Sequence, residues 1–168
     1  WVHSSLYGGF LDVMREAMGQ IRVGDPADPE TQVGTLVSIA AAQRVESVVE
    51  DACAQGAQAV CGGSRRDAVY APTILVNTPL TSNAVCQEIF GPVANVIPFD
   101  DQEVVLQHIN AGPFGLQAGI YTESLRTAWK LIRELEMGGV IVNGTSTWRS
   151  DQAPYGGIKA SGIGREGP

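Results

Sequence analysis

The sequence has few charged residues, few cysteines and no long apolar run. Charged residues fill only 17% of the 168 positions and hydrophobic residues fill 44%, a balance that argues against a disordered chain. Lys and Arg number 11 against 18 Asp and Glu, so the net charge of −7 argues against a nucleic-acid backbone or an anionic membrane as partner. The apolar runs are all shorter than the roughly 18 residues of a membrane span.

The three cysteines show no spacing that is typical of a site. Cys53, Cys61 and Cys86 are an odd number and lack the C-x-x-C pattern, so neither a disulfide framework nor a metal site is expected. This cysteine usage favours a reducing, cytoplasmic location. Cys53 falls on the apolar side of an expected helix and Cys61 at the end of an expected strand, which favours buried structural thiols over a nucleophile.

Apolar residues recur at helical spacing in four segments and as short runs in five others. We expect helices over 6–21, from Ser38 to Gly56, from Asp100 or Asp101 to the break at Gly112-Pro113, and from 122 or 123 to Gly138. Strands are expected over 57–61, 73–76, 93–99, 116–121 and 140–142. This alternation predicts an α/β domain with a mostly parallel sheet flanked by helices.

The two later helices each have an apolar stripe that we expect to point inward. The stripe of the first contains Val104, Val105, His108 and Ile109. That of the second contains Leu125, Ala128, Trp129, Ile132 and Leu135. Gly138 is the expected C-terminal glycine of the second helix, and the residues after Asn143 are expected to form a glycine-rich loop.

A carboxylate and an aromatic ring stand two positions apart in Gln87-Glu88-Ile89-Phe90-Gly91-Pro92, just before an apolar strand. Side chains two apart in an extended segment point to the same side, so Glu88 and Phe90 are expected to face one ligand. A carboxylate accepts both hydroxyl hydrogens of a ribose diol, and an aromatic ring packs on a planar heterocycle. The pair therefore suits a nucleoside. The alternative interpretation is a surface Glu beside a core Phe.

The long segment 148–162 follows the last expected strand, where α/β folds often hold ligand-binding residues. Trp148 and Tyr155 are expected to form walls of a pocket and Arg149 to hold an anionic group. The alternative is an ordinary subunit contact in which Arg149 pairs with Asp151. The G-x-G-x-x-G spacing over 162–167 lacks the preceding strand and following helix of a dinucleotide fingerprint.

Four segments that occur in order resemble the C-terminal part of the aldehyde dehydrogenase superfamily. They are Gln87-Glu88-Ile89-Phe90-Gly91-Pro92-Val93, Phe114-Gly115-Leu116-Gln117-Ala118-Gly119-Ile120-Tyr121-Thr122, Gly139-Val140-Ile141-Val142-Asn143 and Pro154-Tyr155-Gly156-Gly157-Ile158-Lys159-Ala160-Ser161-Gly162-Ile163-Gly164-Arg165-Glu166. The resemblance implies an α/β catalytic-domain portion over 1–143 and a Gly-rich substrate or interface loop of the same domain over 144–168. It also implies oxidation of an aldehyde to a carboxylic acid with NAD or NADP through a cysteine thiohemiacetal.

The same resemblance implies roles for individual residues. Glu88 is similar to the family's glutamate that binds the ribose on the nicotinamide side, and Phe90 to the residue that packs beside the nicotinamide. Asn143, Trp148 and Tyr155 match positions that shape the substrate tunnel, and Arg149 stands beside them. Arg165 matches a residue expected to support a subunit interface.

The family's nucleophilic cysteine lies in an Asn-x-Gly-Gln-x-Cys context that residues 1–168 do not contain. We therefore expect a fragment that is inactive alone, with a parent enzyme whose missing N-terminal part supplies the nucleophile, the general base and the nucleotide-binding domain. The expected partners are a small-molecule aldehyde, that missing part and further copies in a homo-oligomer. The alternative is a non-catalytic assembly or interaction module of the same fold. The sequence leaves the aldehyde and the choice between NAD and NADP open.

Overall fold

The computed structural model describes residues 1–167 and divides into two compact units. The first comprises residues 1–100, and the second begins at Asp101. The segment from residue 144 onward, expected to be a loop of the same domain as residues 1–143, belongs to the second unit. Within residues 1–167, no helix combines the length and the apolar character needed to cross a membrane.

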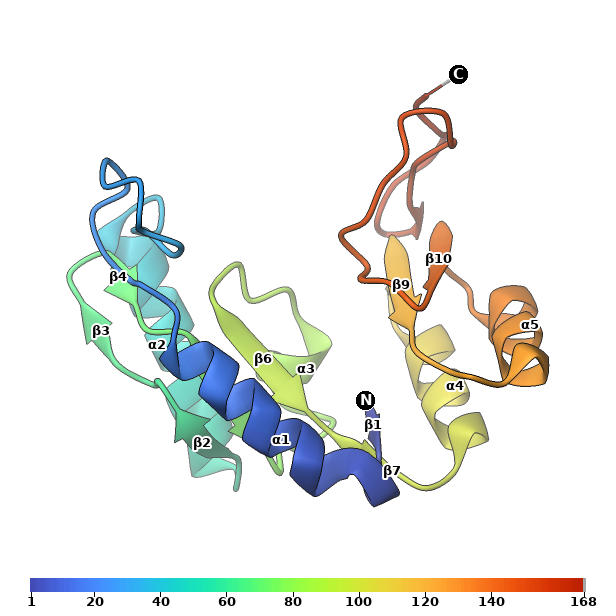
Figure 1. Ribbon diagram of the computed structural model, residues 1–168. Helices are drawn as coiled ribbons and strands as arrows, with labels where there is room; N and C mark the ends of the chain where they lie inside the picture. The colour runs from blue at the N-terminus through green and yellow to red at the C-terminus, as the bar shows by residue number, and fades with distance from the viewer. Residues whose placement is uncertain (168) are drawn as a thin grey trace. The chain divides into compact units, whose positions relative to one another are not determined.

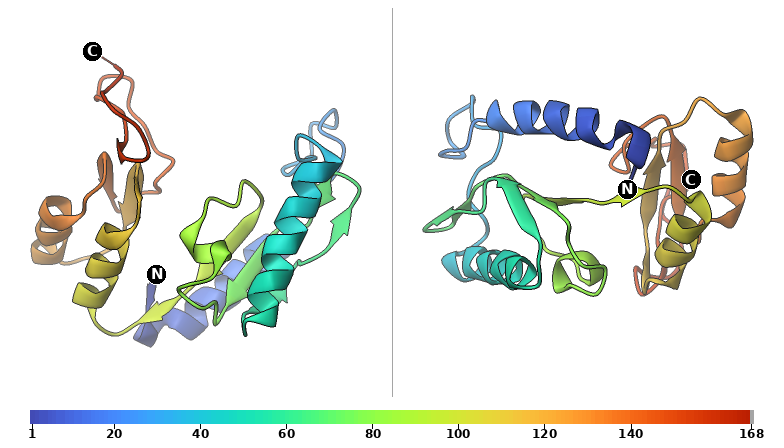
Figure 2. Two further views of the ribbon diagram at one scale, coloured as in Figure 1. Left: turned by 180° about the vertical axis from the view of Figure 1, so that it is seen from behind. Right: turned by 90° about the horizontal axis from the view of Figure 1, so that it is seen from below.

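In the first unit, helices cover both faces of a three-stranded sheet (Figures 1 and 2). The sheet has the order β2–β5–β6, with β2 antiparallel and β6 parallel to β5. The right-hand view of Figure 2 shows α1 on one side of this sheet and α2 with α3 on the other side. The bounds are β1 (Val2–His3), α1 (Ser4–Gly19), α2 (Ile39–Ala54), β2 (Gln58–Cys61), β3 (Arg65–Arg66), β4 (Val69–Tyr70), β5 (Thr73–Val76), α3 (Asn83–Cys86), β6 (Val93–Val96) and β7 (Pro98–Phe99).

Strand β5 forms the core of this unit because all four of its residues are buried, as the sequence predicts. Its side chains alternate between the two faces of the sheet. Leu75 packs in the cluster that contains Val45 and Val49 of α2, whereas Ile74 and Val76 pack with apolar residues of α1. Tyr70 completes the α2 side, and burial raises the pKa of its phenol above the ordinary value.

Helix α2 begins and ends where the sequence predicts. The Ser38 hydroxyl accepts a hydrogen bond from the backbone N–H of Ala41 at 3.1 Å, which satisfies one of the free donors of the first turn. Gly56 follows the helix with a φ of +111°, a conformation that residues with a Cβ rarely adopt. These two residues therefore set where α2 begins and ends.

The second unit is built on a parallel pair of strands, β9 (Gln117–Ile120) and β10 (Gly139–Val142). The helices α4 (Gln102–Ala111) and α5 (Leu125–Glu134) lie on the same side of this pair (Figures 1 and 2). A second, antiparallel pair joins β8 (Phe114–Gly115) to β11 (Ile158–Lys159). The chain therefore returns from the final loop to the start of the unit.

Polar contacts, rather than a large core, connect the segments of this unit. The Lys159 ammonium donates to the carbonyl oxygens of Asn110 and Gly112 and forms a 2.8 Å ion pair with Glu136. The Asn110 side chain donates to Glu134 O at 2.6 Å and accepts from the backbone N–H of Glu136 at 2.9 Å. One cation and one amide thus join the ends of α4 and α5 to β11.

The α/β class is confirmed, and the strand pairings are mixed in detail. β1–β7, β5–β6 and β9–β10 are parallel, whereas β2–β5, β3–β4 and β8–β11 are antiparallel. The expected strand 93–99 is interrupted at Ile97, and β11 forms inside a segment that was expected to be loop throughout.

The expected inward faces of α4 and α5 are partly wrong. In α4, Val105 is buried as expected and His108 and Ile109 are partly buried, but Val104 is 57% exposed and Leu106, outside the expected stripe, is buried. In α5, Ala128 is buried but Leu125 and Trp129 are 72% and 53% exposed. An apolar stripe predicts that a helix has an apolar face, but it does not predict what covers that face.

Gly138 was expected to end α5, but the helix already ends at Glu134. Gly138 instead lies where the chain passes closely beside another segment. A Cβ at this position would lie 1.8 Å from the carbonyl oxygen of Gly156 and 2.9 Å from that of Leu116. The requirement for glycine at this position is steric, because the chain just before β10 passes directly beside the final loop.

Substitution of this glycine provides a test of that packing. We expect Gly138→Ala to lower the free energy of unfolding by about 2 kcal/mol, because the contacting atoms are backbone and cannot rotate away. The matched control is Gly8→Ala inside α1, where a Cβ meets nothing within 4 Å; it should raise stability by about 0.5–1 kcal/mol. Urea unfolding followed by circular dichroism measures both, and equal effects would contradict the steric role.

Candidate cofactor and substrate sites

Glu88 and Phe90 lie in the connection between α3 and β6 in the first unit. Both side chains are exposed, Phe90 by 71%, whereas Ile89 between them packs against the buried cluster of α2 and β5. The interpretation of Phe90 as a core residue is therefore wrong. Because the intervening side chain points inward, the carboxylate and the ring are both available to a ligand.

The sequence predicts an extended backbone from Glu88 to Phe90, and that prediction is wrong at Phe90. Gln87 is extended, with φ −123° and ψ 156°, but Phe90 has a φ of +50°. The left-handed region costs a residue with a Cβ about 1–2 kcal/mol, so the surrounding contacts must stabilise it. Gly91 follows immediately, and a Cβ there would lie 2.7 Å from a methyl carbon of Val45 in α2.

The exposed carboxylate of Glu88 and the exposed ring of Phe90 are the kinds of group that one half of a nicotinamide dinucleotide would need. An exposed carboxylate can accept both hydroxyl hydrogens of a ribose, and an exposed ring can pack on a planar heterocycle. The other half of such a cofactor needs a helix N-terminus for the pyrophosphate. The G-x-G-x-x-G segment 162–167 contains no helix, so it does not supply one.

Asn143 lies at the end of β10 and joins it to the end of β9. Its side-chain amide accepts from the backbone N–H of Thr122 at 2.9 Å and donates to the carbonyl oxygen of Thr122 at 3.1 Å. Asn143 has a φ of +53°, a conformation that Asn tolerates better than most residues. Its side chain therefore holds the parallel strand ends together, a contact that the expectation of a tunnel residue did not include.

Arg149, Tyr155 and Glu166 form a cluster in the final loop, which we call the Arg149 cluster. The Arg149 guanidinium lies 4.7 Å from the centroid of the Tyr155 ring and donates to the Glu166 carboxylate at 2.6 Å. Two backbone hydrogen bonds of 2.9 and 2.8 Å pair Tyr155 with Glu166. The alternative interpretation paired Arg149 with Asp151, and that pairing is wrong: the two backbone hydrogen bonds between Tyr155 and Glu166 bring the Glu166 carboxylate to Arg149 instead.

Trp148 precedes this cluster and is 56% exposed. Its carbonyl oxygen accepts from the Gln117 amide of β9 at 2.6 Å. Residues 144–146 pass close above Gly119, where a Cβ would lie 2.6 Å from the carbonyl oxygen of Gly144. The start of the loop is therefore fixed on β9, and the exposed indole extends from a fixed backbone.

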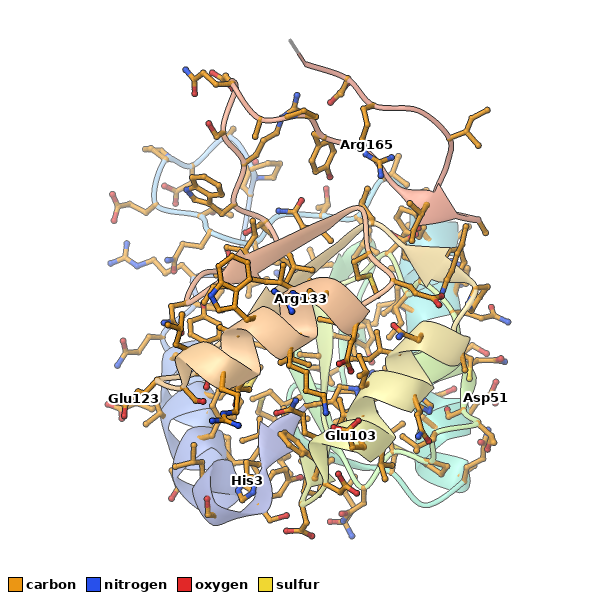
Figure 3. The ribbon with its side chains drawn as sticks, turned by 90° about the vertical axis from the view of Figure 1, so that its right-hand side faces the viewer. His3, Asp51, Glu103, Glu123, Arg133 and Arg165 are labelled. Atoms are coloured by element: carbon orange, nitrogen blue, oxygen red, sulfur yellow. The ribbon has the colours of Figure 1, made fainter. Side chains whose placement is uncertain are left out.

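Arg165 lies in the same loop, as Figure 3 shows. Its guanidinium donates to the carbonyl oxygens of Gly157 at 2.9 Å and Gly164 at 2.7 Å. These bonds fold the end of the loop back on the segment that leads into β11. A contact of Arg165 at a subunit interface stays a prediction.

The three cysteines are free thiols, and their exposure differs from the expectation. Cys53 and Cys86 are exposed and Cys61 is partly buried, so the expectation of a buried Cys53 is wrong. Ala52 occupies the inward position of that helical turn. Cys86 donates its S–H to Leu80 O at 3.1 Å. The described residues contain no group of three His, Cys, Asp or Glu side chains that could hold a metal ion.

The sequence matches the model of the aldehyde dehydrogenase family over residues 1–168. The chain belongs to the aldehyde dehydrogenase family. It is 40% identical over 168 residues to a 3-sulfolactaldehyde dehydrogenase of Priestia aryabhattai, a match that covers 100% of this chain and 35% of that protein.

Two solved structures of similar proteins match the fold closely. Aldehyde dehydrogenase 21 from Physcomitrella patens, in complex with the reaction product succinate, matches with TM-score 0.96 and 37% identity over 99% of this chain and 34% of that one. Glyceraldehyde-3-phosphate dehydrogenase GapN from Methanocaldococcus jannaschii, complexed with NADP, matches with TM-score 0.93 and 35% identity over 99% of this chain and 36% of that one. The chain thus spans about a third of the length of these proteins.

Sequence reasoning missed three contacts that the structure places at the predicted residues. Glu166 pairs with Arg149, Gln117 fixes Trp148, and Arg44 of α2 donates to the carbonyl oxygen of Ile89. The partners are separated by 17, 31 and 45 positions. Periodicity reports only neighbours along the chain, so no local signal was available for these contacts.

The double hydrogen bond of Asn143 leads to a stability prediction. Asn143→Ala should lower the free energy of unfolding by about 2 kcal/mol, from two lost hydrogen bonds and the cost of Ala in the left-handed region. Asn143→Gly loses the same bonds without that backbone cost, so it should be about 1 kcal/mol less destabilising. Thermal and urea unfolding of both variants measure this difference. Unchanged stability would show that Asn143 has no structural role.

Proposed function

We propose that residues 1–168 form the C-terminal part of an enzyme that oxidises an aldehyde to a carboxylic acid with NAD+ or NADP+. The observation that carries this proposal is the exposed pair Glu88 and Phe90 in a chain of the aldehyde dehydrogenase family. The nucleophilic cysteine belongs to polypeptide outside this chain. A cytoplasmic location and a homo-oligomeric assembly belong to the same proposal, and the exposed apolar residues of α5 are available for contacts with other polypeptide.

The residues of this chain have binding and orienting roles in the proposed reaction. Glu88 accepts hydrogen bonds from the two ribose hydroxyls next to the nicotinamide, and Phe90 packs beside the nicotinamide ring. The bound dinucleotide supplies the hydride acceptor. Correct placement of the acceptor relative to the aldehyde carbon contributes to the rate because it removes the entropic cost of orientation.

The first test replaces the carboxylate in a full-length protein that contains residues 1–168. Glu88→Gln retains the shape of the side chain but removes the charge and one acceptor, so it should raise the KM for the cofactor about tenfold, the effect of a lost charge-assisted hydrogen bond. Steady-state kinetics with NAD+ and with NADP+ measure the change. The control is Glu50→Gln, at an exposed position of α2. Unchanged kinetics with both cofactors would remove Glu88 from the site.

We further propose that the aldehyde carries an anionic group that Arg149 binds, in a substrate tunnel formed with Trp148, Tyr155 and Asn143. Three similar proteins support this class, since sulfolactaldehyde, succinate and glyceraldehyde 3-phosphate are anions, whereas other relatives are named for lactaldehyde, which is neutral, and betaine aldehyde, which is a cation. In the Arg149 cluster, the guanidinium lies on the Tyr155 ring and remains 42% exposed. Glu166 partly neutralises it, so an anionic substrate competes with Glu166 for the same cation.

This competition predicts opposite effects for the two charged partners. Arg149→Met should lower kcat/KM about tenfold for an aldehyde that carries a carboxylate or sulfonate, and leave a neutral aldehyde of the same length nearly unchanged. Glu166→Gln should raise kcat/KM about threefold for the anionic aldehyde, because the cation is no longer neutralised. Arg126→Met, at an exposed position of α5, is the charge control. Equal effects of Arg149→Met on both aldehydes would contradict the proposal.

A further inference from the structure

Three contacts connect helix α2 to the segment from Glu88 to Gly91. The guanidinium of Arg44 donates to the carbonyl oxygen of Ile89. The Ile89 side chain packs against the buried cluster that contains Val45, and Gly91 lies so close to Val45 that a Cβ would approach its methyl carbon to 2.7 Å. The helix therefore contacts this segment on both sides of Phe90.

Phe90 needs such support because its backbone lies in the left-handed region, with a φ of +50°. That conformation costs a residue with a Cβ free energy, and it persists only where surrounding contacts determine it. Residue 89 is fixed through its carbonyl and its side chain, and residue 91 through its close approach to α2. With both neighbours fixed, the Phe90 ring stays directed outward and 71% exposed.

We propose that Arg44 is a positioning residue: through the Ile89 carbonyl it holds the backbone that presents Glu88 and Phe90 to the nicotinamide riboside. This inference rests on the proposed function, which assigns the cofactor to Glu88 and Phe90. Arg44 acts through the backbone of residue 89 and does not itself contact the cofactor. Its side chain is exposed, so its contribution to the overall core is small.

The choice of Arg at this position follows from the donor geometry. A guanidinium carries several N–H donors in one plane and retains its charge at every physiological pH, whereas the ammonium of Lys is a compact donor on a flexible chain. Arg44, next to the inward-facing Val45 in α2, is therefore well suited to fix a carbonyl oxygen. Lys should replace it in part, and Met, of similar length, should not.

The experiment measures cofactor binding, not turnover, in a full-length protein that contains residues 1–168. Titration with NADPH or NADH, followed by the fluorescence of the reduced cofactor, gives the Kd for each variant. Arg44→Met should raise the Kd about tenfold and Arg44→Lys about threefold, as expected for the loss or weakening of one charge-assisted hydrogen bond. Arg66→Met, at an exposed position of β3, removes the same charge and should leave the Kd unchanged.

A double-variant comparison separates positioning from independent binding. If Arg44 acts by placing Glu88, the double variant Arg44→Met/Glu88→Gln should have a Kd less than about twofold above that of Glu88→Gln alone. The hydrogen bond of the Glu88 carboxylate to the ribose is already weakened in Glu88→Gln, so little remains for Arg44 to position. Fully additive losses would show that Arg44 acts independently of Glu88 and would overturn the inference. The melting temperature should change by no more than about 2 °C, and a much larger fall would assign Arg44 a purely structural role.

The outcomes also separate this inference from the proposed function. If Glu88→Gln weakens cofactor binding while Arg44→Met leaves the Kd unchanged, the cofactor role of Glu88 stands and the positioning role of Arg44 is wrong. If Glu88→Gln itself leaves the Kd unchanged, the proposed cofactor contact is wrong and the positioning role is wrong with it.

Discussion

The first unit depends on the complete burial of strand β5 between two helical layers. Each side chain from Thr73 to Val76 is buried, and their alternation divides the core into a layer toward α1 and a layer toward α2. A strand with both faces covered allows no change of register, because a slip by one residue would exchange the two faces. The position of α2 over the sheet is therefore fixed by β5, and every contact that α2 makes is fixed with it.

The segment with Glu88 and Phe90 receives its geometry from these two elements. At its C-terminal end, Thr73 of β5 donates its backbone N–H to Pro92 O at 2.8 Å, which starts the parallel pairing of β6. Toward α2, Ile89 and Gly91 pack on Val45. A binding residue attached to fixed secondary structure is held more precisely than one in a free loop. The left-handed turn at Phe90 thus follows from the sheet and helix on which it lies.

The sequence predicts those features that depend on neighbours along the chain. The Ser38 cap, the glycine after α2, the burial of Thr73–Val76 and the exposed Glu88 all follow from local chemistry or from a motif. The missed features are contacts over long separations, such as Arg44 with Ile89. The exposed Trp129 shows the same limit. An apolar side chain on a helix indicates that burial would be favourable, but it does not indicate which segment would bury it.

In the second unit, hydrogen bonds and ion pairs hold the final loop in place, whereas apolar packing holds the segment with Glu88 and Phe90 in the first unit. Its final loop is held by directed polar contacts, with Lys159 to two carbonyl oxygens and Arg165 to two others. Such contacts fix a backbone without filling space, so side chains such as Trp148 stay exposed. The loop can therefore change its side chains without disturbing a core. Arg149 forms an ion pair with Glu166 at the surface, so the charge that this loop presents depends on that carboxylate.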